Sequence, residues 1–270
     1  MNLGVRVASG LALAVVLAMG LWAGGVILDV VLAVAVGVGL FEFSGLLGRL
    51  SMSPPPWLLY PLAGWFLFRA LLPADVPVLE IGLGVGVVGG LLAALGLGNR
   101  GFLRWAAAVG GALWLGWCLG EYLTLMRWHG GGQERFGLRI VVPVLAAAMV
   151  GDTAALLTGR SLGRHPFFPK ISPKKTVEGA LGGALVTMLV STACSAWLLG
   201  LPVWQGLLLG AAIAVAAQGG DLVESALKLA AGENDASRLI PGHGGLLDRL
   251  DSLVLVGPVA YAVLRIVRLG

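Results

Sequence analysis

The sequence predicts an all-α, polytopic membrane protein built as a single helical bundle. Hydrophobic residues make up 58% of the 270 residues and charged residues 12%, and the mean hydropathy is +0.92. That composition leaves too little polar surface to cover a water-soluble globule. Several apolar runs also approach the roughly 20 residues that cross ~30 Å of hydrocarbon as a helix. We therefore expect one continuous membrane domain and no large soluble domain.

About nine transmembrane helices are expected, separated by polar or Gly/Pro-rich turns. Little more than Gly24 and Gly25 divides the first two runs, and the chain contains 43 glycines, so eight or ten spans also fit the pattern. The first run follows Arg6 like a signal peptide, but no small-residue cleavage site follows and the next run begins at once, so we interpret it as a membrane helix. The nine apolar runs lie at about 7–24, 26–47, 56–72, 77–97, 105–126, 140–158, 177–199, 203–228 and 246–268.

Basic residues predict which side of the membrane each loop occupies. Five Lys and Arg residues lie between Arg160 and Lys175, and such an excess is typical of cytoplasmic loops. The net charge of +4 therefore indicates anionic lipid headgroups and phosphates, not nucleic acid, as partners. A cytoplasmic N-terminus would place on the same side Arg6, Arg49, Arg100, Arg104 and the loops 159–175 and 229–245.

Small residues in the apolar runs predict close helix packing. Gly84-Val-Gly86-Val-Val-Gly89 formally matches a dinucleotide-binding fingerprint, but it lies in an apolar run without a strand or an acidic partner. The spacings Gly86 to Gly90 and Gly179 to Gly183 instead suit helices whose backbones approach closely in lipid. Cys118 and Cys194 lie in apolar runs without metal-ligand spacing, so we predict neither a disulfide nor a metal role for them.

The run at 203–228 has a polar stripe. Its polar side chains recur every three or four residues, so they share one face of a helix whose other faces are apolar: Gln218, Asp221, Glu224, Ser225 and Lys228. A carboxylate at membrane depth costs several kcal/mol unless it is paired, hydrated or bound to metal. The stripe therefore indicates either a functional cavity or an internal carboxylate–lysine bridge. Asp152, in the run 140–158, is an isolated candidate for the same cavity.

The last run begins with an acidic turn. Pro241-Gly-His-Gly-Gly245 leads into Asp248 and Asp251, which lie one helical turn apart. Gly244 and Gly245 allow the backbone to approach a phosphate at this helix start, although acidic residues also simply make a good helix N-terminus. If Asp221 supplies a further carboxylate, hard oxygen ligands together with phosphates describe a Mg²⁺ site.

A basic segment, Ser172 to Gly179 (SPKKTVEG), precedes the run at 177–199. We expect the helix to start at Thr176 or Glu178. Lys174 and Lys175 could bind a nucleotide triphosphate or a lipid headgroup as point charges. Basic residues beside a cytoplasmic helix end also occur as ordinary topology signals that bind anionic lipid without specificity.

Together these segments resemble the CDP-diacylglycerol synthases, or phosphatidate cytidylyltransferases. The family signature is similar to S-x-x-K-R-x4-K-D-x-S-x2-I-P-x-H-G-G-x2-D-R-x-D. Leu229 and Asn234 depart from it, each standing where the family usually has a basic residue. The likeness covers the chain from Asp152 onward, so we expect N-terminal transmembrane helices at 1–139 and a C-terminal transmembrane catalytic region at 140–270. The residues in register are Ser225, Lys228, Asp235, Ser237, Pro241, His243, Gly244, Gly245, Asp248, Arg249 and Asp251.

The resemblance implies Mg²⁺-dependent transfer of the cytidylyl group of CTP to phosphatidic acid, with release of pyrophosphate. It also implies a homodimer in the inner (plasma) membrane, whose polar cavity opens to the cytoplasm and to lipid, and it allows a second cation. It suggests Asp221 and Asp248 as metal ligands, supported by Asp251 and Glu224. The catalytic set is Asp221, Asp248, His243, Lys228 and Arg249; the substrate-binding set is Ser172, Lys174, Lys175, Thr176, Glu178, Ser225, Arg238, Gly244 and Gly245.

Two other functions fit parts of the pattern. A related CTP-dependent membrane enzyme could act on another lipid phosphate or on a polyprenol, because nothing in the apolar lining identifies the acceptor. An ion-coupled transporter could use Asp152, Asp221 and Glu224 as an ion path. That function predicts inverted repeats, which the sequence does not show, and it leaves the His-Gly-Gly-x-x-Asp-Arg-x-Asp string unexplained.

Overall fold

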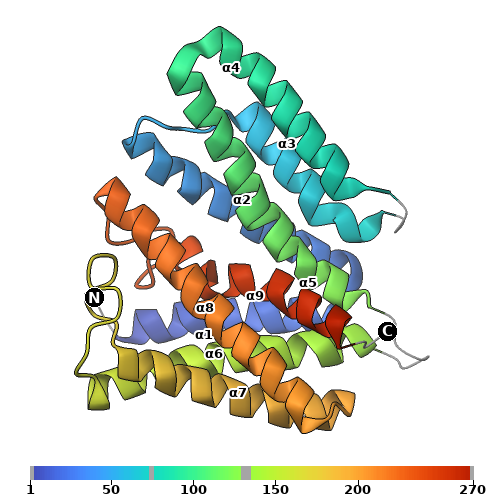
Figure 1. Cartoon of the computed structure of the whole chain (residues 1–270), viewed down its shortest axis with the longest axis vertical. Coiled ribbons are helices and arrows are strands. Elements are labelled where there is room, and N and C mark those ends of the chain that lie inside the picture. Colours follow the sequence, from blue (N-terminus) through green and yellow to red (C-terminus); the bar gives the residue numbers. More distant parts are fainter. Residues whose placement is uncertain (1–2, 73–75, 129–134, 268–270) are drawn as a thin grey trace. The chain divides into compact units, whose positions relative to one another are not determined.

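The computed structural model describes residues 3–72, 76–128 and 135–267 as an all-α protein (Figure 1). The helices of these residues fall on the predicted runs, except that α4 continues through the break predicted between residues 97 and 105. The last predicted run extends to residue 268, outside the described residues. The helices are α1 (Leu3–Ala23), α2 (Gly25–Arg49), α3 (Pro56–Leu67), α4 (Val78–Gly111), α5 (Cys118–Met126), α6 (Phe136–Leu162), α7 (Val177–Leu199), α8 (Val203–Ala231) and α9 (Leu247–Ile266).

The chain divides into two compact units. The first unit contains residues 1–124 and 227–250, and the second contains residues 125–226 and 251–270. The end of α8 and the beginning of α9 therefore belong to the first unit, whereas the longer parts of both helices belong to the second. The predicted division at residue 139 remains a prediction.

In the first unit, α2, α3 and the segment that follows α4 form an apolar core. Leu40, Leu59, Phe66 and Leu115 are almost completely buried there. A short 3₁₀ turn, η1 (Phe68–Leu71), extends α3, and a π-helical turn, η2 (Ala112–Trp117), joins α4 to α5. A side chain at Gly116 would lie only 2.6 Å from the carbonyl oxygen of Ala63, so glycine is what lets η2 lie against α3.

The helix α4 folds back on itself. The indole nitrogen of Trp105 donates to the carbonyl of Gly86, although 19 intervening steps of straight helix would separate them by about 28 Å. Figure 1 shows the corresponding bend in α4. The two predicted runs at 77–97 and 105–126 are therefore two arms joined by a helical bend, and Gly90 and Gly86 lie where the second arm packs. The packing interpretation of these glycines is confirmed.

In the second unit, α6 and α7 pack closely along their length (Figure 1). A Cβ atom at Gly183 would lie 2.7 Å from that of Ala155, and one at Gly179 would lie 2.8 Å from the Ala155 carbonyl oxygen. These contacts confirm the role predicted for the Gly179 to Gly183 spacing. The start of α7 is also as expected, because the Thr176 hydroxyl accepts a bond from the Gly179 amide and caps the helix.

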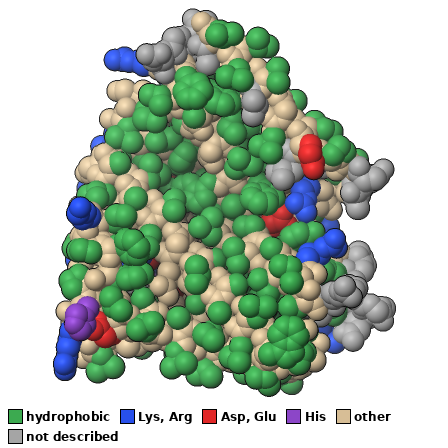
Figure 2. Space-filling model, viewed as in Figure 1, with side chains coloured by type: hydrophobic (Ala, Val, Ile, Leu, Met, Phe, Trp, Pro, Cys, Tyr) green, Lys and Arg blue, Asp and Glu red, His purple; other side chains and the backbone are tan. Residues whose placement is uncertain are grey.

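Five helices of the described residues are long and apolar enough to cross a membrane, fewer than the nine predicted. The short length of α3, 12 residues, and the charged first turns of α9 explain part of the difference. Many large apolar side chains are exposed, including Trp22, Val26 and Trp197, and they cover much of the face in Figure 2. Such a surface suits contact with lipid. The five spans are Gly25–Arg49, Arg100–Met126, Phe136–Leu162, Val177–Leu199 and Val203–Ala231.

Candidate active site

The signature segment, Ser225 to Asp251, joins α8 to α9 through an irregular loop. Within it, the Ile240 amide donates to the Gly244 carbonyl and the His243 amide donates to the Ile240 carbonyl, which closes a tight turn. Gly242 and Gly244 have φ values of 81° and 80°, a left-handed conformation that favours glycine. The conformation of the turn thus favours glycine just before the His-Gly-Gly string, at Gly242, and within it, at Gly244.

Asp248 organises the loop from the first turn of α9. One carboxylate oxygen accepts a bond from the Lys228 ammonium at 2.6 Å, and the other accepts bonds from the backbone amides of Ala236 and Gly245 at 2.9 and 2.7 Å. Its side chain is 5% exposed, so these charge-assisted bonds are shielded from water. Asp248 therefore ties the end of α8, the loop and the start of α9 together.

Glu42, on α2, is a second organising carboxylate that the sequence interpretation missed. It is 2% exposed and accepts bonds from the Ser237 hydroxyl and from the backbone amides of Leu246 and Leu247, the latter two at 3.0 and 2.6 Å. Any Cβ at Gly245 would lie 2.8 Å from its carboxylate oxygens. A carboxylate within an apolar run was the available signal, since such a group needs partners at membrane depth.

His243 lies against α1. Its Nδ1 atom is 2.8 Å from the Ser9 hydroxyl, which also donates to the Pro241 carbonyl at 3.0 Å. Gly10 lies beside the imidazole, where a Cβ would come within 3.3 Å of its Cε1 atom. Ser9 therefore holds the imidazole and the turn together, a contact that the sequence pattern did not indicate.

In the second unit, the basic segment contacts the polar stripe of α8. The Lys175 ammonium lies 2.7 Å from Asp221, whose other oxygen accepts a bond from the Ser225 hydroxyl at 3.3 Å. Asp152 lies close to Asp221, Lys175 and Ser252, so it belongs with this cluster and is not isolated. Asp221 remains accessible, because 37% of its side chain is exposed.

The other predicted residues of the second unit have different surroundings. Glu178 accepts bonds from the amides of Arg164 and His165 and from the His165 imidazole, so it fastens the loop before α7. Lys174 is exposed, and the Ser172 carbonyl accepts a bond from the Lys175 amide. On the long helices, Glu224 is fully buried, and an Asp251 carboxylate oxygen accepts a bond from the next amide in α9.

A polar cavity of about 360 Å³ lies in the first unit, beside the loop that follows α8. Arg49 of α2 pairs there with Glu233. Arg238 is exposed at the cavity, and Arg249 is exposed on α9. The lining contains two arginines and two carboxylates, so its formal charge is balanced. The lining residues are Arg49, Glu233, Asn234, Asp235, Ala236, Ser237 and Arg238.

Comparison with known proteins decides the family. The model of the "Cytidylyltransferase family" matches residues 4–267. The chain belongs to this cytidylyltransferase family. It is 42% identical over 129 residues to the "Uncharacterized protein YnbB" of Escherichia coli strain K12, a match that covers 48% of this chain and 43% of the relative.

Other relatives have a named activity, and two of them illustrate the match. The "Phosphatidate cytidylyltransferase" of Synechocystis sp. is 45% identical over 132 residues, which cover 47% of this chain and 44% of the relative. That of Bacillus subtilis strain 168 is 34% identical over 154 residues, covering 57% and 55%. The chain thus spans about half the length of the curated relatives it matches.

The carboxylates of this cytidylyltransferase differ in how well they are suited to act as metal ligands. Across the described ranges, no three His, Cys, Asp or Glu side chains form a ready-made metal cluster. Mg²⁺ commonly binds through one or two protein carboxylates together with substrate phosphates, so a smaller donor set fits it. Asp221 is partly exposed and lies beside Asp152, so it has the chemistry for that role, although Lys175 and Ser225 contact its two oxygens. Both oxygens of Asp248 have partners too, and its side chain is almost completely buried.

Proposed function

We propose that this protein transfers the cytidylyl group of CTP to phosphatidic acid, producing CDP-diacylglycerol and pyrophosphate. The observation that supports this most strongly is the signature segment, which matches the synthase pattern in register and folds around Asp248. The names of two relatives point to the same substrate. The resemblance further supports a homodimer in the inner membrane, with its site facing the cytoplasm.

In the proposed reaction, a phosphate oxygen of phosphatidic acid attacks the α-phosphorus of CTP. A new P–O bond forms there, and the bond from the α-phosphorus to the β-phosphate oxygen breaks, so that pyrophosphate leaves with the electron pair. The second pKa of a phosphomonoester is near ~6, so the nucleophile is largely anionic at neutral pH and needs little help from a base. The protein's main task is therefore to bind and orient two polyanions.

The basic side chains would perform that task. Lys175 and Lys228 are already oriented by carboxylates, at 2.7 and 2.6 Å, so each ammonium is held in place before a phosphate arrives. Preorganised cations lose less conformational entropy on binding than mobile ones. The exposed side chains Lys174, Arg238 and Arg249 would add contacts to phosphate oxygens, and His243, held by Ser9, would add a hydrogen bond.

Asp221 and Asp248 would hold Mg²⁺, with Asp251 and Glu224 in support. Bound Mg²⁺ supplies positive charge that neutralises the leaving pyrophosphate. For both Asp221 and Asp248 this role requires an exchange of partners, because both oxygens of each carboxylate already bind donors of the protein.

The test uses the purified full chain with CTP labelled at the α-phosphate, phosphatidic acid and Mg²⁺. We expect labelled CDP-diacylglycerol and an equal amount of pyrophosphate. Glu80→Gln, which changes an exposed carboxylate of α4, serves as a control with unchanged turnover. Absence of labelled lipid with a folded protein would contradict the proposal.

A second candidate acceptor follows from Leu229 and Asn234, where two basic residues of the signature are missing. Fewer cations there fit a different lipid phosphate or a polyprenyl phosphate. Supplying each acceptor with CTP labelled separately at the α- and γ-phosphates distinguishes the candidates: the lipid that gains α-label identifies the acceptor, and γ-label alone indicates a kinase.

A further inference from the structure

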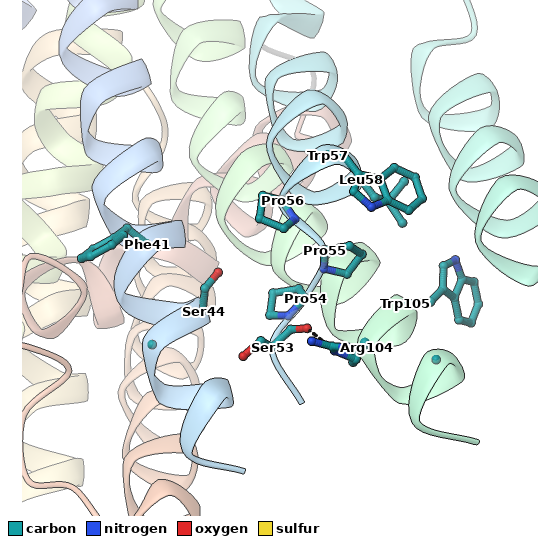
Figure 3. Close-up of a pocket in the computed structure, with 12 residues that line it drawn as sticks. Phe41, Ser44, Ser53, Pro54, Pro55, Pro56, Trp57, Leu58, Arg104 and Trp105 are labelled. Atoms are coloured by element: carbon teal, nitrogen blue, oxygen red, sulfur yellow. Dashed lines mark hydrogen bonds between the residues drawn. The ribbon is translucent and has the colours of Figure 1, made fainter. Parts of the chain in front are cut away.

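A second cavity, of about 530 Å³, lies in the first unit and shares no residue with the signature segment (Figure 3). Its lining comes from α2, the segment that follows it, the beginning of α3 and the second arm of α4. Aromatic, proline and leucine side chains make up most of the wall. The lining residues are Phe41, Ser44, Gly45, Ser53, Pro54, Pro55, Pro56, Trp57, Leu58, Gly101, Arg104 and Trp105.

The cavity lies where three helical segments begin or end. The span of α2 ends at Arg49, α3 begins at Pro56, and the span of the second α4 arm begins at Arg100. If these spans cross the bilayer, their shared end lies at one membrane interface, the level of the lipid phosphates. Trp57 and Trp105 are of the residue type that is enriched at this level.

The wall combines an apolar surface with one fixed charge. Pro54, Pro55 and Pro56 have no backbone N–H, so this segment offers rings and no amide donors. The Arg104 Nε donates to the Ser53 carbonyl at 2.9 Å, which holds the guanidinium beside the proline segment (Figure 3). A guanidinium has five N–H donors, so the two terminal nitrogens provide four more for an anion.

We propose that this cavity binds one glycerophospholipid, with an acyl chain along the apolar wall and the phosphate at Arg104. The volume lies within the ~300–1,000 Å³ typical of ligand pockets, and basic pockets between membrane helices bind lipid headgroups elsewhere. The bilayer supplies this amphiphile at the right depth. The site is separate from the proposed cytidylyl transfer and does not depend on it.

Two glycines of α2 provide a matched test of the acyl-chain position. A Cβ at Gly45, in the lining, would meet no atom within 4 Å, and neither would one at Gly37, which lies outside the lining. Leucine suits a helix better than glycine, so both substitutions should preserve α2. Gly45→Leu should fill the cavity and weaken lipid binding about tenfold or more, whereas Gly37→Leu should bind like the wild type.

Arg104→Gln tests the phosphate contact, with Arg100→Gln as its control one turn earlier on α4. Full-length protein, delipidated in detergent, is titrated with dioleoylphosphatidylglycerol and bound lipid is counted by native mass spectrometry. Dioleoylglycerol, which lacks the phosphate, and glycerol phosphate, which lacks the chains, complete the set of probes. Melting temperatures show that each variant is folded.

We expect one phosphatidylglycerol per chain, about tenfold weaker binding in Arg104→Gln, and no comparable binding of either partial probe. Equal binding of dioleoylglycerol, or of glycerol phosphate, would overturn the proposal, because one half of the lipid would then suffice. Wild-type binding by Gly45→Leu, or equal loss in the Gly37 or Arg100 controls, would also overturn it.

Discussion

Asp248 and Asp221 are both aspartates paired with a lysine, yet their surroundings differ. Asp248, in the first unit, has three donors and a side chain that is 5% exposed, whereas Asp221, in the second unit, is 37% exposed and bonded through side chains. Backbone amides bound to Asp248 make it part of the loop's architecture. The comparison teaches that the same residue type, paired with lysine in both places, can be built into a loop at one position and stay accessible at another.

The largest effect is expected for Asp248→Asn. An asparagine cannot accept at both positions without placing N–H donors against Lys228 or the loop amides, so the free energy of unfolding should fall by about 3 kcal/mol. Activity should be lost as well. Thermal melting of the full chain measures the first effect, and pyrophosphate release measures the second. An unchanged melting temperature would contradict the structural role that distinguishes Asp248 from Asp221.

Glu42→Gln should have the next largest effect and lower the free energy of unfolding by about 2 kcal/mol. The amide NH₂ would replace one carboxylate oxygen, so at least one of the three donors would face another N–H and lose its acceptor. Thermal melting of this variant tests whether the loop depends on α2. The control is Glu80→Gln, which removes an exposed carboxylate elsewhere in the first unit and should leave the melting temperature within experimental error.

Asp221→Asn should give the opposite profile from Asp248→Asn. The melting temperature should change little, since the side chain is partly exposed and its ion pair is screened. The Mg²⁺ concentration for half-maximal activity should rise at least tenfold, equivalent to about 1.4 kcal/mol. Turnover measured against Mg²⁺ concentration checks this, and a normal Mg²⁺ dependence would remove Asp221 from the proposed metal site.

Ser9→Ala should have the smallest effect, below about 1 kcal/mol, because it removes one hydroxyl from His243 and Pro241. The melting temperature should fall slightly, and turnover should fall severalfold if the imidazole needs this orientation. Ser9→Thr, which keeps the hydroxyl, should restore both. Equal turnover in wild type and Ser9→Ala would show that the imidazole orientation does not matter.

Much of the fold could be predicted because its signals are local. The start of α7 follows from the Thr176 cap, and its end follows from Gly200, whose φ of 67° suits the left-handed turn after a helix. The bend of α4 was expected only as a break between two runs. The sequence is compatible with eight, nine or ten spans, because the length of an apolar run does not by itself say whether the helix crosses a bilayer.

The sequence by itself determined the membrane class and the family, because both follow from composition and from the spacing of residues close together in the chain. Only the tertiary structure decided that Glu42 caps α9, that Ser9 holds His243 and that α8 and two loop amides occupy both oxygens of Asp248. These bonds to Glu42 and Ser9 join residues about 200 positions apart. A buried carboxylate needs hydrogen-bond donors, and the fold can supply them from residues that are distant in the sequence. Local residue spacing therefore does not predict which donors those are.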